Sequence, residues 1–326
     1  MGTEQNKRQY DWRELLARYG TIFGFFTMCI IFALLSDVFL KYNNILNILL
    51  QSTMLAIISF GLTIVIISGE FDASLSSIVA LSGVITTLLL SNGWGIIPAF
   101  LVGLLPGIVI GFLNAIAVLW LGVSSFIATL GMMSSVTGIV YMITQGRSIW
   151  QSIPEDYLWL GRGYFMGIPV PVITLALLFL LLWFFLTQTN LGRKMYAVGG
   201  NAEAARLSGI NVRKIRMLAF IIGGFLAALC GVLLASRLGS GQPTAGGTYF
   251  LDAIAATFLG QSIFSKGKPH LTGTLIGVLI IGTMNNGFVL LGMSYYIQDL
   301  IKGLVIVLAV AVATIGAKNK NQYTVK

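Results

Sequence analysis

The chain has 326 residues, of which 56% are hydrophobic and only 10% are charged. Soluble domains carry roughly 25% charged residues, so this composition excludes a water-soluble globule and predicts a protein that crosses the membrane several times. The net charge of +9 does not indicate nucleic-acid binding, because the basic residues fall in short connectors between apolar runs.

Apolar runs, divided at polar residues and at Gly or Pro, predict an all-α polytopic membrane protein with about ten transmembrane helices. The first run is longer than a signal-peptide core of about 7–15 residues and lacks a cleavage pattern after it, so we interpret it as a retained span. The expected spans lie near Tyr19–Leu40, Leu46–Ser68, Ser74–Leu90, Ile96–Leu121, Ser124–Thr144, Ile168–Thr187, Arg216–Ser236, Tyr249–Phe264, Leu271–Leu291 and Tyr296–Ile315.

Basic residues are distributed unequally between the two sides that ten spans define. One side has only Lys41, Arg147, Arg162 and Arg237. The other side holds both termini and the central loop, and its basic residues are Lys7, Arg8, Arg13, Arg18, Arg193, Lys194, Arg206, Arg213, Lys214, Arg216, Lys266, Lys268, Lys318, Lys320 and Lys326. An excess of Lys and Arg marks the cytoplasmic side, so we expect both termini in the cytoplasm.

This topology predicts three parts of the chain. Residues 1–18 form a cytoplasmic N-terminal segment, and residues 19–317 form the permease domain. That domain includes a cytoplasmic loop at about 188–215, and residues 318–326 form a cytoplasmic tail. On the opposite side, the long connector Gln145–Gly167 mixes aromatic and charged residues, which is typical of an interfacial anchor or of a platform for a partner.

Small residues recur at every fourth position in two of the spans, which predicts helices whose backbones approach closely. These residues are Gly103, Gly107 and Gly111 in the fourth span, and Gly223, Ala227 and Gly231 in the seventh.

A faint internal repeat relates the two halves of the chain. Gly107–Gly111 matches Gly273–Gly277, and Asp72-Ala73 matches Asp252-Ala253. The matching elements are five spans apart, so their membrane orientation is reversed. We therefore expect an inverted repeat of helices 2–5 and 7–10, whose interface would line a transport path.

The cysteines and the single histidine do not indicate a metal or catalytic centre. Cys29 and Cys230 lie inside apolar runs, where free cysteine behaves as a small hydrophobe. His270 has no nearby cysteine or second histidine, so we interpret it as a loop residue.

The central cytoplasmic loop contains a short segment with recognisable helix ends. It consists of Asn201, Ala202, Glu203, Ala204, Ala205, Arg206, Leu207, Ser208 and Gly209. The first of these predicts an N-cap, the acid and the base complement the helix dipole, and the final glycine suits a left-handed stop. A capped helix of about two turns has no core of its own, so it is either a docking element for a partner protein or a surface turn.

This segment, with motifs elsewhere, resembles the ribose/xylose/galactose-type permeases of ATP-binding-cassette importers, from about Asn43 onward. The further motifs are Phe126–Gly131, Leu251–Ala256, Gly273–Gly277, Asn286-Gly287, Leu290–Gly292 and Lys302-Gly303. Two places depart from the family pattern. Gly69-Glu-Phe-Asp stands where Gly-Gly-Ile-Asp is usual, and Gly260-Gln261 stands where a Gly-Gly pair is commoner.

The resemblance implies a transport subunit without enzymatic activity in a bacterial cell (inner) membrane. Its implied partners are ABC ATPase subunits, a second permease copy and a periplasmic or other extracytoplasmic sugar-binding protein. The segment Asn201–Gly209 would be the coupling helix that contacts the ATPase. The sequence has no phosphate-binding P-loop, so ATP and Mg²⁺ belong to the ATPase and this chain binds no cofactor or metal of its own.

Polar residues in the spans are candidates for the translocation path, because polar groups within a membrane usually face a cavity or one another. The polar candidates are Asp72, Asn114, Asp252, Asn285, Asn286 and Gln298, and Phe126 of the Phe126–Gly131 motif is a further, apolar candidate. For each polar candidate, hydrogen bonding between helices explains its presence in a span as well as contact with the substrate does. We expect Asp299 and Lys302, three residues apart, to form a structural pair.

The sequence favours three other functions less than a sugar permease. A branched-chain amino acid permease belongs to the same broad superfamily, and the motifs around Asn201 and Asn286 count against it. A secondary transporter generally needs buried ionisable residues, which are scarce in these spans. An intramembrane enzyme would need a cluster of His, Asp or Glu with catalytic spacing, which the sequence lacks.

Overall fold

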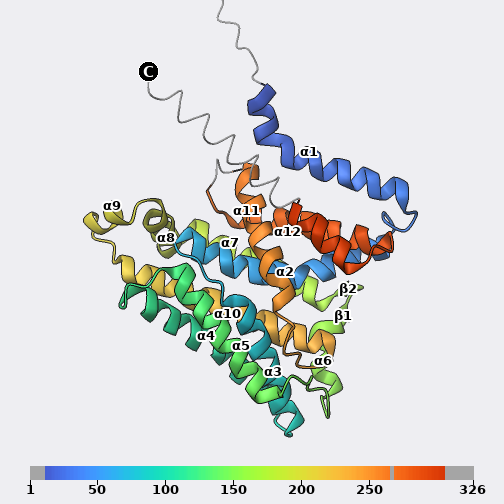
Figure 1. The fold of residues 1–326 in the computed structure, drawn as a ribbon, viewed down its shortest axis with the longest axis horizontal. Coiled ribbons are helices and arrows are strands. Elements are labelled where there is room, and N and C mark those ends of the chain that lie inside the picture. The colour runs from blue at the N-terminus through green and yellow to red at the C-terminus, as the bar shows by residue number, and fades with distance from the viewer. Residues whose placement is uncertain (1–11, 265–267, 305–326) are drawn as a thin grey trace, which may run out of the picture.

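The computed structural model is a bundle of helices (Figure 1). It describes residues 12–264 and 268–304, with the backbone alone for residues 12–22 and 262–264. The elements in chain order are α1 (Trp12–Leu35), α2 (Tyr42–Ile67), α3 (Leu75–Ser91), α4 (Ile96–Leu119), α5 (Ser125–Thr144), α6 (Glu155–Arg162), β1 (Tyr164–Phe165), β2 (Ile168–Pro169), α7 (Val170–Gln188), α8 (Asn190–Gly200), α9 (Ala202–Leu207), α10 (Val212–Leu238), α11 (Gly247–Phe264) and α12 (Leu271–Leu290).

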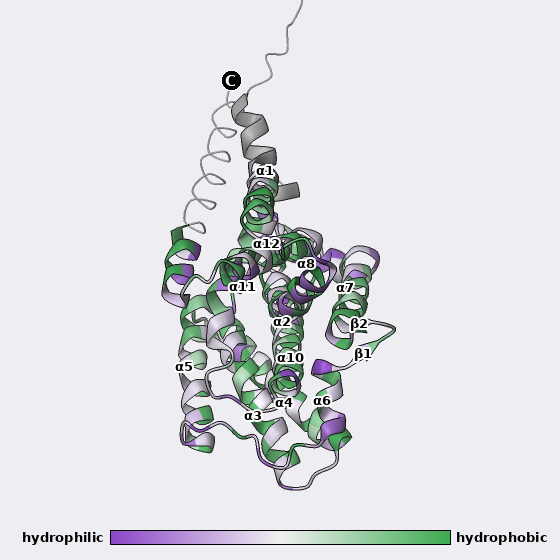
Figure 2. Ribbon diagram, turned by 90° about the vertical axis from the view of Figure 1, so that its right-hand side faces the viewer, coloured by the Kyte–Doolittle hydropathy of each residue, from purple (hydrophilic) through white to green (hydrophobic). Residues whose placement is uncertain are grey.

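The all-α class predicted from the sequence is confirmed. Among the described residues, six helices are long and apolar enough to cross a membrane, namely α2, α4, α5, α7, α10 and α12. Shorter apolar helical stretches lie in Phe23–Leu35 and Leu75–Ser91. Figure 2 shows apolar residues along the helices of the bundle and polar residues gathered on α6 and α8.

The number of spans stays a prediction. Residues 295–304 are helical, but most of the predicted tenth span and the tail 318–326 lie outside the described residues. At the other end of the chain, α1 begins at Trp12, inside the stretch 1–18 that we assigned to a cytoplasmic segment.

Helix α10 lies at the centre of the bundle, where α2, α3 and α4 pack against it. Glycine residues in these helices allow their backbones to approach closely. A Cβ atom added to Gly107 of α4 would overlap the carbonyl oxygen of Gly224, and one added to Gly231 would overlap that of Val79 in α3. The close approach predicted from the small-residue stripes is therefore confirmed.

The connector between α5 and α7 is more ordered than its sequence indicates. It contains α6 and the β1–β2 hairpin, and Tyr157 of α6 is fully buried against α10. The Tyr157 hydroxyl donates to the carbonyl oxygen of Val232 at 2.6 Å, and the Ser236 hydroxyl donates to the carbonyl oxygen of Tyr157 at 2.6 Å. We call the end of the bundle with α6 the hairpin end, and the end with α8 and α9 the coupling end (Figure 1).

Candidate coupling surface and translocation path

Two short helices, α8 and α9, form the coupling end of the molecule. The Thr189 hydroxyl caps α8 by accepting from the Gly192 N–H at 3.1 Å. The Asn201 Oδ1 atom caps α9 by accepting from the Ala204 N–H at 3.0 Å, and Gly209 adopts a φ of +80° just past its end. The N-cap and the left-handed glycine stop are both confirmed.

Helix α9 exposes most of its surface. Ala205 is buried, whereas Leu207 is 77% exposed. Arg206 Nη2 lies 2.5 Å from Glu203 Oε1, and this hydrogen-bonded guanidinium lowers the pKa of the Glu203 carboxyl. A large apolar side chain beside an exposed ion pair makes α9 a surface suited to another protein.

Helix α8 packs directly on the end of α2. Met195 and Val198 are buried, and a Cβ atom added to Gly199 would overlap the carbonyl oxygen of Ile67. Beside this contact, Arg216 Nη1 lies 2.7 Å from Glu70 Oε1, with side chains that are 24% and 9% exposed. The coupling end therefore contacts the end of α2 and the loop between α2 and α3 directly.

That loop places Asp72 in a buried polar cluster. Asp72 Oδ1 accepts from the Ser74 hydroxyl at 2.6 Å, and Asn114 Nδ2 of α4 donates to Asp72 Oδ2 at 3.2 Å. The Thr129 hydroxyl oxygen of α5 accepts from the Ala73 N–H at 3.0 Å. These bonds connect α3, α4 and α5 at one point.

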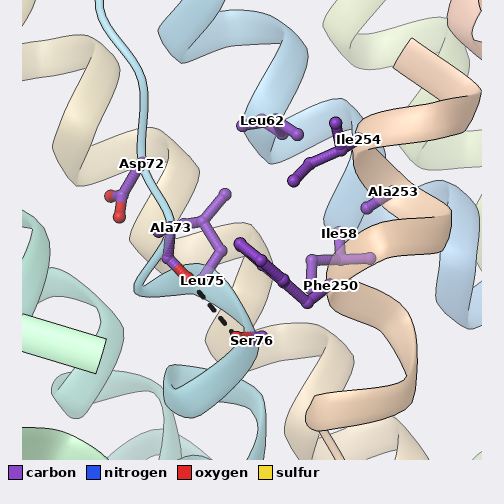
Figure 3. Close-up of a pocket in the computed structure, with 9 residues that line it drawn as sticks. All are labelled: Ile58, Leu62, Asp72, Ala73, Leu75, Ser76, Phe250, Ala253 and Ile254. Carbon is purple, nitrogen blue, oxygen red and sulfur yellow. Dashed lines mark hydrogen bonds between the residues drawn. The ribbon is translucent and has the colours of Figure 1, made fainter. Parts of the chain in front are cut away.

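A small pocket lies between this loop and α11. It is lined by Ile58, Leu62, Asp72, Ala73, Leu75, Ser76, Phe250, Ala253 and Ile254. Figure 3 shows that the Asp72 carboxylate points away from the apolar side chains of the pocket. In this conformation the carboxylate holds helices together, and the pocket presents mainly carbon.

A second polar cluster lies toward the hairpin end. Asn285 Nδ2 of α12 donates to Asp252 Oδ2 of α11 at 3.2 Å, and Lys302 Nζ lies 3.8 Å from the same oxygen. Lys302 also lies 3.4 Å from Asp299, which confirms the pair expected from the sequence. The contact between Lys302 and Asp252 has no signal in the sequence, because the two residues are 50 positions apart.

The other path candidates are separated from these clusters. Asn286 and Asn44 exchange two buried amide hydrogen bonds, of 2.9 and 3.0 Å, which join α12 to α2. Gln298 donates to the Met293 carbonyl oxygen at 2.7 Å. Phe126 is 51% exposed and its ring lies 5.5 Å from that of Phe71.

Glu70 is a functional candidate that sequence reasoning did not assign. Glu70 departs from the family pattern in the sequence, but its partner Arg216 is not predictable from spacing.

Among the described residues, no group of three or more His, Cys, Asp or Glu side chains could hold a metal ion.

Known proteins place the chain in a transport family. Residues 44–310 match the family model described as "Branched-chain amino acid transport system / permease component". The chain belongs to this family.

Curated relatives match along nearly their whole length. The ribose import permease protein RbsC of Bacillus subtilis (strain 168) is 44% identical, over 94% of this chain and 95% of that protein. The D-allose transport system permease protein AlsC of Escherichia coli (strain K12) is 36% identical, over 94% of each. The L-arabinose ABC transporter permease protein AraH of Azospirillum brasilense is 33% identical, over 91% and 87%.

This chain is therefore a permease subunit of an ATP-binding-cassette importer, a transport component and not an enzyme. The membership decides against the secondary transporter and the intramembrane enzyme that were weighed from the sequence.

Proposed function

We propose that the chain forms the translocation path for a monosaccharide of the ribose, xylose or galactose type, delivered by an extracytoplasmic binding protein. Relatives named for ribose, D-allose and L-arabinose support this substrate class, since each matches over 91% or more of the chain. The description of the family model names branched-chain amino acids, so these are the second candidate substrate.

ATP hydrolysis is assigned to a partner ATPase, which would also bind the Mg²⁺. The proposed docking surface is α9 with the exposed face of α8. It is supported by the exposed Leu207 and by the close contact of Gly199 with the end of α2, which would pass a movement of the ATPase into the spans.

A second permease copy is the proposed partner within the membrane, and α5 is the helix that best fits that contact. Gly131, Ser134, Ser135 and Gly138 are exposed on α5, and a Cβ atom added to either glycine would meet nothing within 4 Å. Small polar residues are typical of helix contacts and water-lined paths and unusual on a lipid-facing surface.

The chain is proposed to lie in the bacterial cell (inner) membrane with both termini in the cytoplasm. The asymmetry of basic residues between the two sides supports this orientation. Residues 1–18 and 318–326 would be the cytoplasmic ends of a permease domain at 19–317, with the coupling end at about 188–215 facing the ATPase.

The test is uptake by the complete importer, reconstituted in proteoliposomes with its cognate ATPase and binding protein. We expect ATP-dependent uptake of D-ribose, D-allose or L-arabinose, and no ATP hydrolysis by this chain alone. Uptake of leucine in place of all three sugars would establish the second candidate and defeat the first.

A further inference from the structure

An open cleft lies at the hairpin end, between the end of α10 and the start of α11. It is lined by Leu234, Leu238, Gln242, Thr244, Ala245, Thr248 and Tyr249. Its amide, hydroxyl and phenol groups can donate and accept hydrogen bonds, and its leucines supply an apolar wall. Such a mixed lining is typical of sites for small polar molecules.

The cluster around Asp252 lies one helical turn from the cleft. Thr248 and Asp252 are four residues apart in α11, so they lie on the same face of the helix, one turn from each other. The Asp252 and Lys302 side chains are 13% and 17% exposed. Both residues lie in spans predicted from the sequence, and partly buried ionisable residues within spans usually mark a transport path.

The cluster contains one hydrogen-bond acceptor without a partner among the described residues. Asn285 Nδ2 is used by Asp252, whereas Asn285 Oδ1 is buried without a partner among the described residues. A buried acceptor without a partner is unfavourable, so a ligand that donates a hydrogen bond to it is stabilised there. A hydroxyl group can donate to such an oxygen, and it can accept from an ammonium group such as that of Lys302.

We propose that the cleft and the Asp252–Asn285–Lys302 cluster form a binding site for the hydroxyl groups of the sugar as it enters the permease. The site suits an uncharged polyol better than an amino acid, because the Lys302 ammonium is already shared by the carboxylates of Asp252, at 3.8 Å, and Asp299, at 3.4 Å. The carboxylate of an amino acid would have to displace one of them. This inference rests on the proposed sugar transport and adds the place where the sugar is held.

The test compares Asn285→Leu, which keeps the side-chain volume and removes the amide, with Asn44→Leu as a matched control. Asn44 belongs to α2, and its amide pairs with Asn286 outside the Asp252 cluster. In the complete importer we would measure D-ribose taken up per ATP hydrolysed. Asn285→Leu should lower this ratio about fivefold to tenfold, the loss of one hydrogen bond, while Asn44→Leu lowers thermal stability and leaves the ratio unchanged.

A second variant, Thr248→Val, tests the cleft where Asn285→Leu prevents folding. Its side chain is exposed and the change removes one hydroxyl at equal size. We expect the same direction of effect, about twofold to fivefold. A wild-type importer that moves D-ribose, with variants that keep its sugar-to-ATP ratio, would overturn this site alone. A wild-type importer that moves leucine and no sugar would overturn the proposed function as well.

Discussion

The ion pair between Glu70 and Arg216 differs from the other ion pair at the coupling end in its burial. Glu70 is 9% exposed and Arg216 is 24% exposed, whereas both members of the Glu203–Arg206 pair are about two-thirds exposed, at 65% and 66%. Water screens the exposed pair, so its contribution to stability is small. Removing one partner of the less exposed pair leaves a charge without compensation.

We therefore expect Glu70→Gln to lower the free energy of unfolding by about 2 kcal/mol and Glu203→Gln to change it little. Thermal unfolding of the detergent-solubilised chain measures both. Equal melting temperatures for the two variants would contradict the role that burial gives the Glu70 pair. Loss of the pair should also reduce the ATP hydrolysis that the loaded binding protein stimulates, since it lies beside the contact of α8 with α2.

Gly199 and Gly200 are neighbours with opposite surroundings. A Cβ atom at Gly199 would overlap the carbonyl oxygen of Ile67, and one at Gly200 would meet nothing within 4 Å. Gly199→Ala should therefore destabilise the packing of α8 on α2 by about 1–3 kcal/mol, while Gly200→Ala should not.

Thermal unfolding and sugar uptake by the complete importer measure the outcome for this glycine pair. If Gly199→Ala matched Gly200→Ala in both, the close contact between α8 and α2 would have no part in coupling.

Helix α9 contains two positions at which proline tests the coupling proposal, one as the disruptive change and one as its control. The Ala205 N–H donates to the Asn201 carbonyl oxygen at 3.0 Å, and proline at this position removes that bond inside the helix. Ala202 is the first residue of α9, where proline is well tolerated, and Asn201 before it is already extended at φ −159° and ψ 100°.

Ala205→Pro should break α9 at a cost of about 3 kcal/mol or more and abolish association with the ATPase. Ala202→Pro should keep the helix intact and retain association with the ATPase. Insertion in the membrane should be normal for both variants, because the spans keep their hydrophobicity. Co-purification of the ATPase with each variant measures the effect. Undiminished co-purification with Ala205→Pro would make α9 a surface turn.

At the scale of the whole molecule, the proposed orientation places α9 and α6 on opposite sides of the membrane. A cysteine introduced at Asn201, in a background without Cys29 and Cys230, should be shielded from an impermeant thiol reagent in intact cells. A cysteine at Glu155, in α6, should react. Permeabilised cells provide the control, because both positions should then react. Labelling of Asn201 from outside would reject the proposed topology.

Local sequence determined several parts of this structure before any tertiary contact is considered. The ends of α9 follow from Asn201 and Gly209, because a cap and a left-handed stop involve only residues within one turn of each other. The apolar runs likewise predicted the helices, since a lipid-embedded backbone must satisfy its hydrogen bonds internally. The Gly107 and Gly231 stripes predicted close packing, though not the identity of the neighbouring helices.

Only the tertiary structure decided which polar residues pair with each other and which keep an atom without a hydrogen-bond partner. Asn285 and Asn286 are adjacent in sequence, yet one contacts Asp252 of α11 and the other pairs with Asn44 of α2. Tyr157 resembles an interfacial aromatic residue in sequence, yet it is buried against Val232. These partners lie far apart along the chain and meet through helix packing. The sequence therefore determined a membrane permease and its helices, while the arrangement of the bundle decided which polar side chains meet, because the partners come from different helices.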